Sequence, residues 1–235
     1  MDDELSLRSF GIDSLSSAYS SLEFINDVAA GNRLLAALFE EQEKWLIGTS
    51  VNAIDALEAN VGLEKLVAAL NHTSVRFAAV GEATAKRMTS LAEKSVLIAP
   101  NRDSQSLAQA LQPLQISNAV IPTGLHSRSD LSEMLLLQGV QVVAEPLYTV
   151  IRNPEKPSAY SAVEAGEVTA VLLRSASAAS HFLEFHPSPD LDFYCVGNSA
   201  ADFIESRGLR VSLRLQDPDP HSVAMAISRH ERMKS

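Results

Sequence analysis

Short apolar runs followed by a serine and a stretch of small residues occur twice in the chain. In residues 44–57 the run Trp-Leu-Ile precedes Ser50, and in residues 169–182 the run Val-Leu-Leu precedes Ser175. A short apolar run fits a buried strand, and a serine before an alanine-rich segment fits the start of a helix. The pattern predicts one strand–serine–helix element in each half of the chain.

A second repeated pattern is an apolar strand that ends in a glycine turn and leads into a helix. Gly81 follows Phe-Ala-Ala-Val, and Gly197 follows Phe-Tyr-Cys-Val. In both copies a serine near the start of a further helix comes 25 positions after the glycine, at Ser106 (81 to 106) and at Ser222 (197 to 222). The shared spacing indicates that the two halves of the chain are structural repeats.

Apolar strands that alternate with amphipathic helices predict βαβ units, in which a parallel sheet carries helices on both faces. Residues 119–150 add a further strand–helix–strand unit to the first half, and the proline-containing segment 153–158 fits a linker. We therefore predict an α/β protein with a first lobe at 23–152 and a second lobe at 153–235. An N-terminal segment, residues 1–22, precedes the first lobe.

Composition and charge narrow the class of protein. Apolar residues make up 46% of the 235 positions, which is enough for a packed core. The net charge of −10 disfavours nucleic acid and anionic membranes as partners. No apolar run approaches the roughly 20 residues of a membrane span, and the acidic start Met1-Asp-Asp-Glu4 differs from a secretory signal, so we expect a cytoplasmic protein.

Signatures of cofactor and nucleophile chemistry are missing from the sequence. The single cysteine, Cys195, lies in an apolar run and is expected to be a buried strand residue rather than a reactive thiol. The six histidines show no metal-binding spacing, so no metal site is expected. The nucleotide patterns Gly-x-Gly-x-x-Gly and Gly-x-x-x-x-Gly-Lys-Ser/Thr, and the hydrolase pattern Gly-x-Ser-x-Gly, are also absent.

The order of these pieces, over roughly residues 44–227, resembles the uroporphyrinogen-III synthase family. The resemblance rests on the following ordered set: Thr49-Ser50, Val80-Gly81-Glu-Ala-Thr84, Gly124 with Arg128 and Leu131, Gly139, Pro146-Leu-Tyr148, Arg174-Ser175 and Val196-Gly197. Each piece alone is common in α/β proteins, because glycine turns after strands occur throughout that class. Their order along the chain carries the resemblance.

This resemblance implies two flavodoxin-like lobes with a cleft between them, joined by a flexible double crossover. The implied substrate is hydroxymethylbilane, a linear tetrapyrrole that bears eight carboxylates. The family removes its terminal hydroxyl, forms a spiro intermediate and closes the macrocycle with the last ring inverted, which makes the enzyme a lyase of haem biosynthesis. No cofactor is implied, and we expect a monomer.

Candidate site residues follow from the resemblance and from the chemistry of helix starts. The resemblance places Tyr148 at the cleft as a catalytic residue that assists departure of the hydroxyl, whereas the alternative is a strand tyrosine with a solvated tip. Helix starts hold anions through free backbone N–H groups. The expected substrate-binding residues are Ser50, Gly81, Thr84, Gly124, Arg128, Ser175, Gly197 and Ser199. Thr84 and Ser199 also fit first-turn helix residues, and Arg128 also fits a solvated surface charge.

The N-terminus departs from the family pattern. Residues 1–22 are serine-rich and hold no apolar strand, whereas the family opens with a strand–helix–strand unit that belongs to the second lobe. The second lobe is therefore expected either to have a reduced sheet or to belong to a truncated or divergent member. Together with Ala200, which replaces a hydroxyl residue of the family pattern, this leaves a non-catalytic tetrapyrrole-binding or regulatory relative as the alternative function. A two-lobed binder of the periplasmic type is disfavoured because no export signal precedes it.

Overall fold

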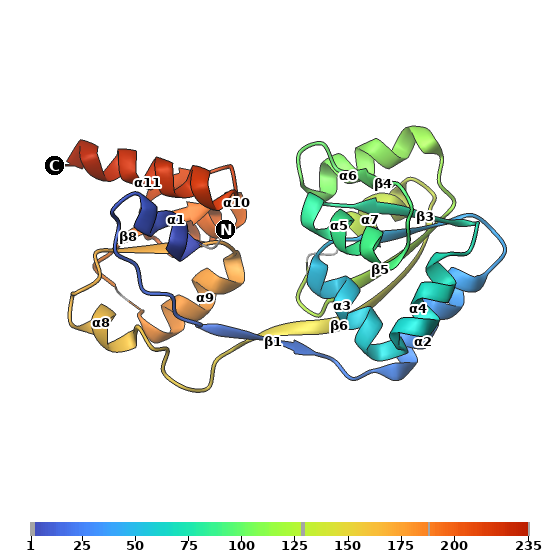
Figure 1. The fold of residues 1–235 in the computed structure, drawn as a ribbon, viewed down its shortest axis with the longest axis horizontal. Helices are drawn as coiled ribbons and strands as arrows, with labels where there is room; N and C mark the ends of the chain where they lie inside the picture. The colour runs from blue at the N-terminus through green and yellow to red at the C-terminus, as the bar shows by residue number, and fades with distance from the viewer. Residues whose placement is uncertain (1–2, 128–129, 188, 235) are drawn as a thin grey trace. The chain divides into compact units, whose positions relative to one another are not determined.

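The computed structural model describes three stretches of the chain, residues 3–127, 130–187 and 189–234. The chain divides into two compact units. The central unit comprises Leu22–Val150, and the terminal unit combines Met1–Ser21 with Ile151–Ser235. The chain therefore passes between the units twice, within the neighbouring strands β1 and β6 (Figure 1).

The central unit is built on a six-stranded sheet in the order β1-β6-β5-β2-β3-β4. The pairs β2–β3, β2–β5, β3–β4 and β5–β6 are parallel. Its strands are β1 (Ser20–Phe24), β2 (Lys44–Gly48), β3 (Val75–Ala79), β4 (Val96–Ile98), β5 (Asn118–Gly124) and β6 (Gln141–Arg152). Its helices are α2 (Val28–Phe39), α3 (Val51–Val61), α4 (Leu63–Leu70), α5 (Glu82–Leu91), α6 (Ser104–Leu111), the 3-10 turn η1 (Gln112–Leu114) and α7 (Asp130–Leu137).

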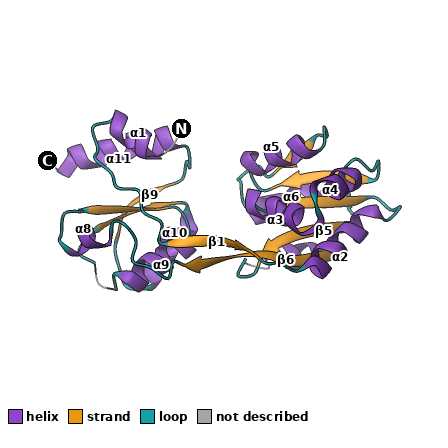
Figure 2. Ribbon diagram, turned by 60° about the horizontal axis from the view of Figure 1, so that its bottom comes forward, coloured by secondary structure: helices purple, strands orange, loops and turns teal. Residues whose placement is uncertain are grey.

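Helices cover both faces of this sheet (Figure 2). The alternation of strand side chains explains the two layers, since Phe77 and Ala79 pack with α2, α3, α4 and α5, whereas Ala78 packs with α6 and α7. The interiors of both layers are mainly aliphatic, and Leu46 and Ile47 are 0% exposed on opposite faces. The predicted parallel sheet with flanking helices is confirmed.

The order of strands in the central unit creates a switch point between β2 and β5. From β2 the chain adds β3 and β4 on one side, and it then returns to place β5 and β6 on the other side. The connections after β2 and β5 therefore diverge. In open α/β sheets, ligands bind at the carboxyl ends of strands at such a switch point. Gly48, at the end of β2, and Gly124, at the end of β5, mark this position.

The terminal unit has a three-stranded parallel sheet in the order β7-β8-β9. Helices α9 and α10 cover one face, and α1 and α11, which lie together in Figure 1, cover the other. Its elements are α1 (Asp3–Ser9), α8 (Tyr160–Glu164), β7 (Ala170–Leu173), α9 (Ala176–Phe185), β8 (Asp192–Val196), α10 (Asn198–Ser206), β9 (Val211–Leu215) and α11 (Pro220–Lys234).

The repeated helix starts have the same geometry in both units. Ser50 caps α3 and Ser175 caps α9, and each hydroxyl oxygen accepts the N–H three residues later at 3.1 Å. The serines of the 25-residue spacing, in contrast, are not caps themselves. Asp103 accepts the N–H of Ser106 and Asp219 accepts the N–H of Ser222, so the aspartate three positions earlier caps each helix.

The N-terminal segment is integrated into the terminal unit. Arg174 binds the carboxylate of Asp3, and the Tyr19 hydroxyl lies 3.1 Å from Nε2 of the buried His186, whose Nδ1 contacts Glu164 at 2.7 Å. The segment holds no apolar strand, as expected, but it does contain the start of the exposed strand β1. The exposure of Leu22 and Phe24 explains why no apolar pattern marks this strand.

Candidate functional site

Two hydroxyl groups meet at the carboxyl edge of the central sheet. The Oγ of Ser50 lies 3.1 Å from the phenolic oxygen of Tyr148. Ser50 comes directly before α3 and is held there by its capping bond to the N–H of Ala53. Tyr148 comes from β6, two strands away from β2, and is partly buried. Two of the predicted site residues are thus brought into contact by the fold.

A β-bulge directs Tyr148 to this position. In the pairing of β5 with β6, Thr123 lies opposite Pro146, but Gly124 lies opposite Tyr148, so that Leu147 is the extra residue. Leu147 and Tyr148 consequently both pack on the core layer that contains α3, although neighbouring strand residues normally face opposite sides. Bulges commonly redirect a side chain in this way next to functional sites.

Gly124 provides the space in which the Tyr148 ring lies. A Cβ atom at this position would lie 2.9 Å from Cζ and 3.1 Å from Cε2 of Tyr148, and 2.7 Å from Oγ of Ser127. Ser127 accepts the N–H of Gly124 at 3.0 Å and donates its own N–H to the carbonyl of Gly124. Sequence reasoning missed Ser127, because its bond to Gly124 depends on how the chain turns after β5.

The turn at Gly81 has open space beside it, whereas the turn at Gly124 is crowded. A Cβ atom at Gly81 would meet no atom within 4 Å, so the backbone at the start of α5 is open to a ligand. Thr84 is only 5% exposed, and its methyl group lies within 2.6 Å of a Cβ built on Gly48. This close approach gives Thr84 a packing role between α5 and the end of β2.

Among the described residues, Arg102 lies beside the start of α5. Arg128 lies outside the described residues. Arg102, which follows β4, has a left-handed backbone (φ 56°) and lies 3.2 Å from the Glu82 carboxylate at the start of α5. Sequence reasoning missed Arg102, because nothing in its local pattern shows that the loop after β4 returns to the turn at Gly81.

The terminal unit presents its predicted residues at the carboxyl ends of β7 and β8. Ser175 caps α9 directly after β7. Gly197, after β8, has φ 80° and ψ 163°, a conformation that essentially only glycine adopts, and its N–H binds the carbonyl of Leu215 at 2.7 Å. Ser199 follows in the first turn of α10, and its side chain is exposed.

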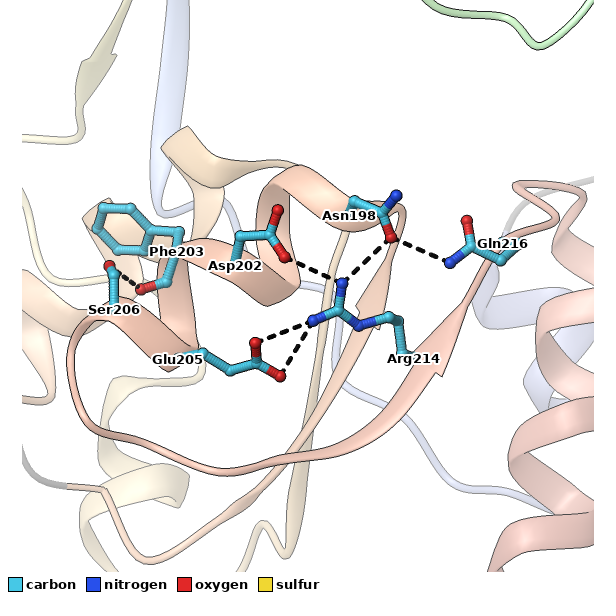
Figure 3. Close-up of polar contacts among 7 residues, drawn as sticks. All are labelled: Asn198, Asp202, Phe203, Glu205, Ser206, Arg214 and Gln216. Atoms are coloured by element: carbon cyan, nitrogen blue, oxygen red, sulfur yellow. Dashed lines mark hydrogen bonds and ion pairs between the residues drawn. The ribbon is translucent and has the colours of Figure 1, made fainter.

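A network centred on Arg214 fixes the start of α10 (Figure 3). The guanidinium binds Glu205 through two bonds of 3.0 Å, Asp202 at 2.9 Å and the amide oxygen of Asn198 at 3.2 Å, and the same oxygen accepts Nε2 of Gln216 at 3.1 Å. Because arginine only donates, the oxygen of Asn198 must face Arg214, which leaves the NH₂ group of Asn198 directed away from the network.

Other arginines of the terminal unit are held by internal partners. Arg174, directly before Ser175, binds Asp3 and also donates to the carbonyl of Pro218 at 2.9 Å. Arg152 lies 3.3 Å from Glu184. The charges of Arg152 and Arg174 are thus each offset by a nearby carboxylate.

Metal-binding and membrane-spanning features are absent from the part of the chain that the structure describes. Over residues 3–127, 130–187 and 189–234, no three or more His, Cys, Asp or Glu side chains gather in a way that would hold a metal ion. In the same ranges, no helix combines the length and the apolar character needed to cross a membrane. Cys195 is fully buried in β8, which confirms the prediction of a buried strand residue, and this burial raises the pKa of its thiol to about 11.

Two solved structures are similar to this chain in fold. A mutant uroporphyrinogen III synthase from the extreme thermophile Thermus thermophilus is 16% identical, with a TM-score of 0.66 over 98% of this chain and 94% of that one. The uroporphyrinogen-III synthetase from Helicobacter pylori 26695 is also 16% identical, with a TM-score of 0.59 over 93% of both chains. No curated protein sequence matches the chain.

A sequence profile of one family spans most of the chain. The profile, described as uroporphyrinogen-III synthase HemD, matches residues 5–224. The matched region includes nearly all of the N-terminal segment, the whole central unit and most of the terminal unit. This chain belongs to the uroporphyrinogen-III synthase family.

Proposed function

We propose that this protein is an active uroporphyrinogen-III synthase that cyclises hydroxymethylbilane. The observation that carries the proposal is the hydrogen-bonded pair of Ser50 and Tyr148 at the switch point of the central sheet. A phenol at the carboxyl edge of a parallel sheet is suited to exchange a proton with a bound ligand. Membership of the family supplies the reaction class in which such a group is useful.

In the proposed reaction, Tyr148 donates its proton to the terminal hydroxyl of the bilane. The C–O bond breaks, water leaves, and the electron pair of the adjacent pyrrole stabilises the resulting cation. The substituted carbon of the last ring attacks this cation to form the spiro intermediate, which then reopens and closes with that ring inverted. The carbon that forms the final bond loses one proton, which restores the proton that Tyr148 gave up.

Substrate carboxylates are proposed to bind at the helix starts that follow the strands. In the central unit these are the starts of α3 and α5, at Ser50 and Gly81, together with the turn at Gly124. In the terminal unit, Ser175, Gly197 and Ser199 offer equivalent positions. Support comes from the open backbone at Gly81 and the exposed hydroxyl of Ser199. Thr84 and Arg128 complete the proposed set.

The isomer composition of the product tests this proposal. Hydroxymethylbilane closes spontaneously to the symmetric isomer I, so an active synthase is revealed by an excess of isomer III. We expect the wild-type protein, given freshly generated hydroxymethylbilane, to yield mainly isomer III by chromatography of the oxidised porphyrins. A product that consists of isomer I alone would overturn the proposal.

A non-catalytic tetrapyrrole-binding relative is the second candidate, and one observation favours it. Ala200, in the first turn of α10, is fully buried and offers no hydroxyl to a ligand. If binding is retained without turnover, the protein should retain an added linear tetrapyrrole in equilibrium dialysis while the isomer ratio stays at the spontaneous value. The same two measurements therefore separate the candidates.

A further inference from the structure

We propose that Ser50 is a positioning residue, which orients the hydroxyl proton of Tyr148 toward the substrate and stabilises the phenolate after that proton has left. The inference rests on the proposed synthase activity and assigns to Ser50 a role beyond contact with substrate carboxylates. The juxtaposition that carries it is the 3.1 Å approach of the two hydroxyl oxygens.

We infer that Ser50 is the donor in this hydrogen bond, and its other partner supports that direction. A serine hydroxyl has one proton and two acceptor lone pairs, and one lone pair already receives the N–H of Ala53 at 3.1 Å. Within the described residues, the Tyr148 oxygen is the one further polar atom that lies within bonding distance of Oγ. Donation to Tyr148 therefore gives the single hydroxyl proton of Ser50 a partner within the protein. The proton of Tyr148 is then free to point away from Ser50.

The capping bond also strengthens Ser50 as a donor. Hydrogen bonds in a chain polarise one another, so an oxygen that accepts the N–H of Ala53 makes its own O–H a better donor to Tyr148. When Tyr148 releases its proton, the accepting oxygen becomes negative, and hydrogen bonds to ionised groups are shorter and stronger than neutral ones. The bond from Ser50 therefore gains strength in the transition state, which is the condition for a catalytic contribution.

The residues around Tyr148 fix its ring, so that rotation of the hydroxyl about the Cζ–O bond is the main motion left to this side chain. The ring lies against Gly124, where an added Cβ would approach Cζ to 2.9 Å, and the bulge at Leu147 fixes the backbone. The hydroxyl hydrogen of a phenol lies in the plane of the ring and has two favoured orientations. A donor on one side selects the other orientation, so Ser50 determines on which side Tyr148 presents its proton.

A double-mutant cycle tests this role. We expect Ser50→Ala to lower kcat by about ten-fold with little change in KM, as the loss of one hydrogen bond to a developing charge predicts. In a Tyr148→Phe background the same substitution should change kcat by less than about two-fold, because the group on which Ser50 acts is absent. Ser50→Thr retains the hydroxyl and should restore most of the rate.

Loss of the helix cap is controlled separately. Asp27 caps α2 through a 2.9 Å bond to the N–H of Ala30, and neither residue belongs to the proposed site. Asp27→Ala should lower the temperature of unfolding to a similar degree as Ser50→Ala while leaving kcat unchanged. If Asp27→Ala lowers kcat as Ser50→Ala does, the effect of Ser50 is structural and the proposal is wrong.

The remaining outcomes separate this proposal from the synthase activity itself. Effects of Ser50→Ala and Tyr148→Phe that multiply, or an effect of Ser50→Ala confined to KM, would overturn the positioning role while the activity stands. Wild-type protein that forms only isomer I would overturn the activity.

The hydrogen bond itself can be tested by NMR with tyrosine labelled with ¹³C at Cζ. The chain has four tyrosines, and the signal that disappears in Tyr148→Phe is that of Tyr148. Ser50→Ala should shift that signal, and an unchanged signal would disprove the hydrogen bond in either case.

Discussion

The hydroxyl oxygens of Ser50 and Tyr148 lie 3.1 Å apart, although the two residues are 98 positions apart in the sequence. Ser50 is fixed by the start of α3 and Tyr148 by the bulge in β6. The pair therefore joins two rigid elements that flank the switch point of the central sheet. Preorganised groups of this kind lower the cost of arranging the site at the moment of reaction.

Tyr148→Phe removes one hydroxyl and retains the ring that packs against Gly124. We expect the rate of isomer III formation to fall by roughly ten- to a hundred-fold, which corresponds to about 1.4–2.7 kcal/mol of transition-state stabilisation. Tyr160→Phe is the matched control, because Tyr160 stacks on His186 in the terminal unit and is not among the proposed site residues. Equal rates for wild type and Tyr148→Phe, with the same circular dichroism, would remove Tyr148 from the mechanism.

Gly124→Ala should displace the Tyr148 ring. The new Cβ would lie 2.9 Å from Cζ of Tyr148 and 2.7 Å from Oγ of Ser127, and neither neighbour can remain in place at that distance. We expect a loss of about 1–3 kcal/mol in the free energy of unfolding, typical of overpacking, together with a lower kcat. Denaturant unfolding and the isomer assay measure the two effects. Unchanged stability would show that the turn relaxes without cost.

The two glycine turns should respond differently to alanine. Gly197 has φ 80° and ψ 163°, so Gly197→Ala should cost about 1–3 kcal/mol of stability through backbone strain. Gly81 has an extended backbone (φ −145°) with open space beside it, so Gly81→Ala should leave the unfolding free energy unchanged or raise it by up to about 1 kcal/mol. If substrate carboxylates approach the start of α5, Gly81→Ala should nevertheless raise KM. Equal stability losses would contradict the assigned backbone conformations.

The thiol of Cys195 should make the protein less stable in alkali. Burial raises the pKa of this thiol to about 11, above the value of an exposed cysteine, so the folded state retains the proton more tightly than the unfolded state. The contribution of this protonated thiol to the free energy of unfolding is fully present below about pH 8.5. It is lost as the pH rises toward 11. Cys195→Ala should show a shallower decline in unfolding free energy over that range.

Thiol reagents at about pH 8 should modify Cys195 only when β8 opens, and rapid modification of the native protein would contradict its burial.

Local sequence patterns predicted the elements of the fold but not every contact between them. The strand–serine–helix repeat was predictable because Ser50 and Ser175 act within three residues of their own positions. The contact of Ser50 with Tyr148 was not predictable, since regular alternation along β6 would place Leu147 and Tyr148 on opposite faces. The bulge that overrides this alternation depends on pairing with β5, which no local pattern of β6 records.

The placement of the N-terminal segment could not be predicted from local sequence patterns either, because its contacts are with residues far away in the sequence. Its anchors are the bond between Asp3 and Arg174, 171 positions apart, and the bond between Tyr19 and His186, 167 positions apart. Helix α1 is short and β1 is exposed, so neither carries a strong periodic signal. Both elements owe their place to partners that come late in the chain.

The discontinuous terminal unit has a consequence for synthesis on the ribosome. The central unit is continuous from Leu22 to Val150 and can fold as soon as it emerges, whereas residues up to Ser21 pack on α11 and β8, near the other end of the chain. At roughly 5–20 residues per second, the stretch of about 210 residues between α1 and α11 takes on the order of 10–42 s to translate. Throughout that time α1 has no partner and remains open to chaperones and proteases. Helix α1 therefore precedes the central unit in the chain but is among the last elements to reach its native contacts.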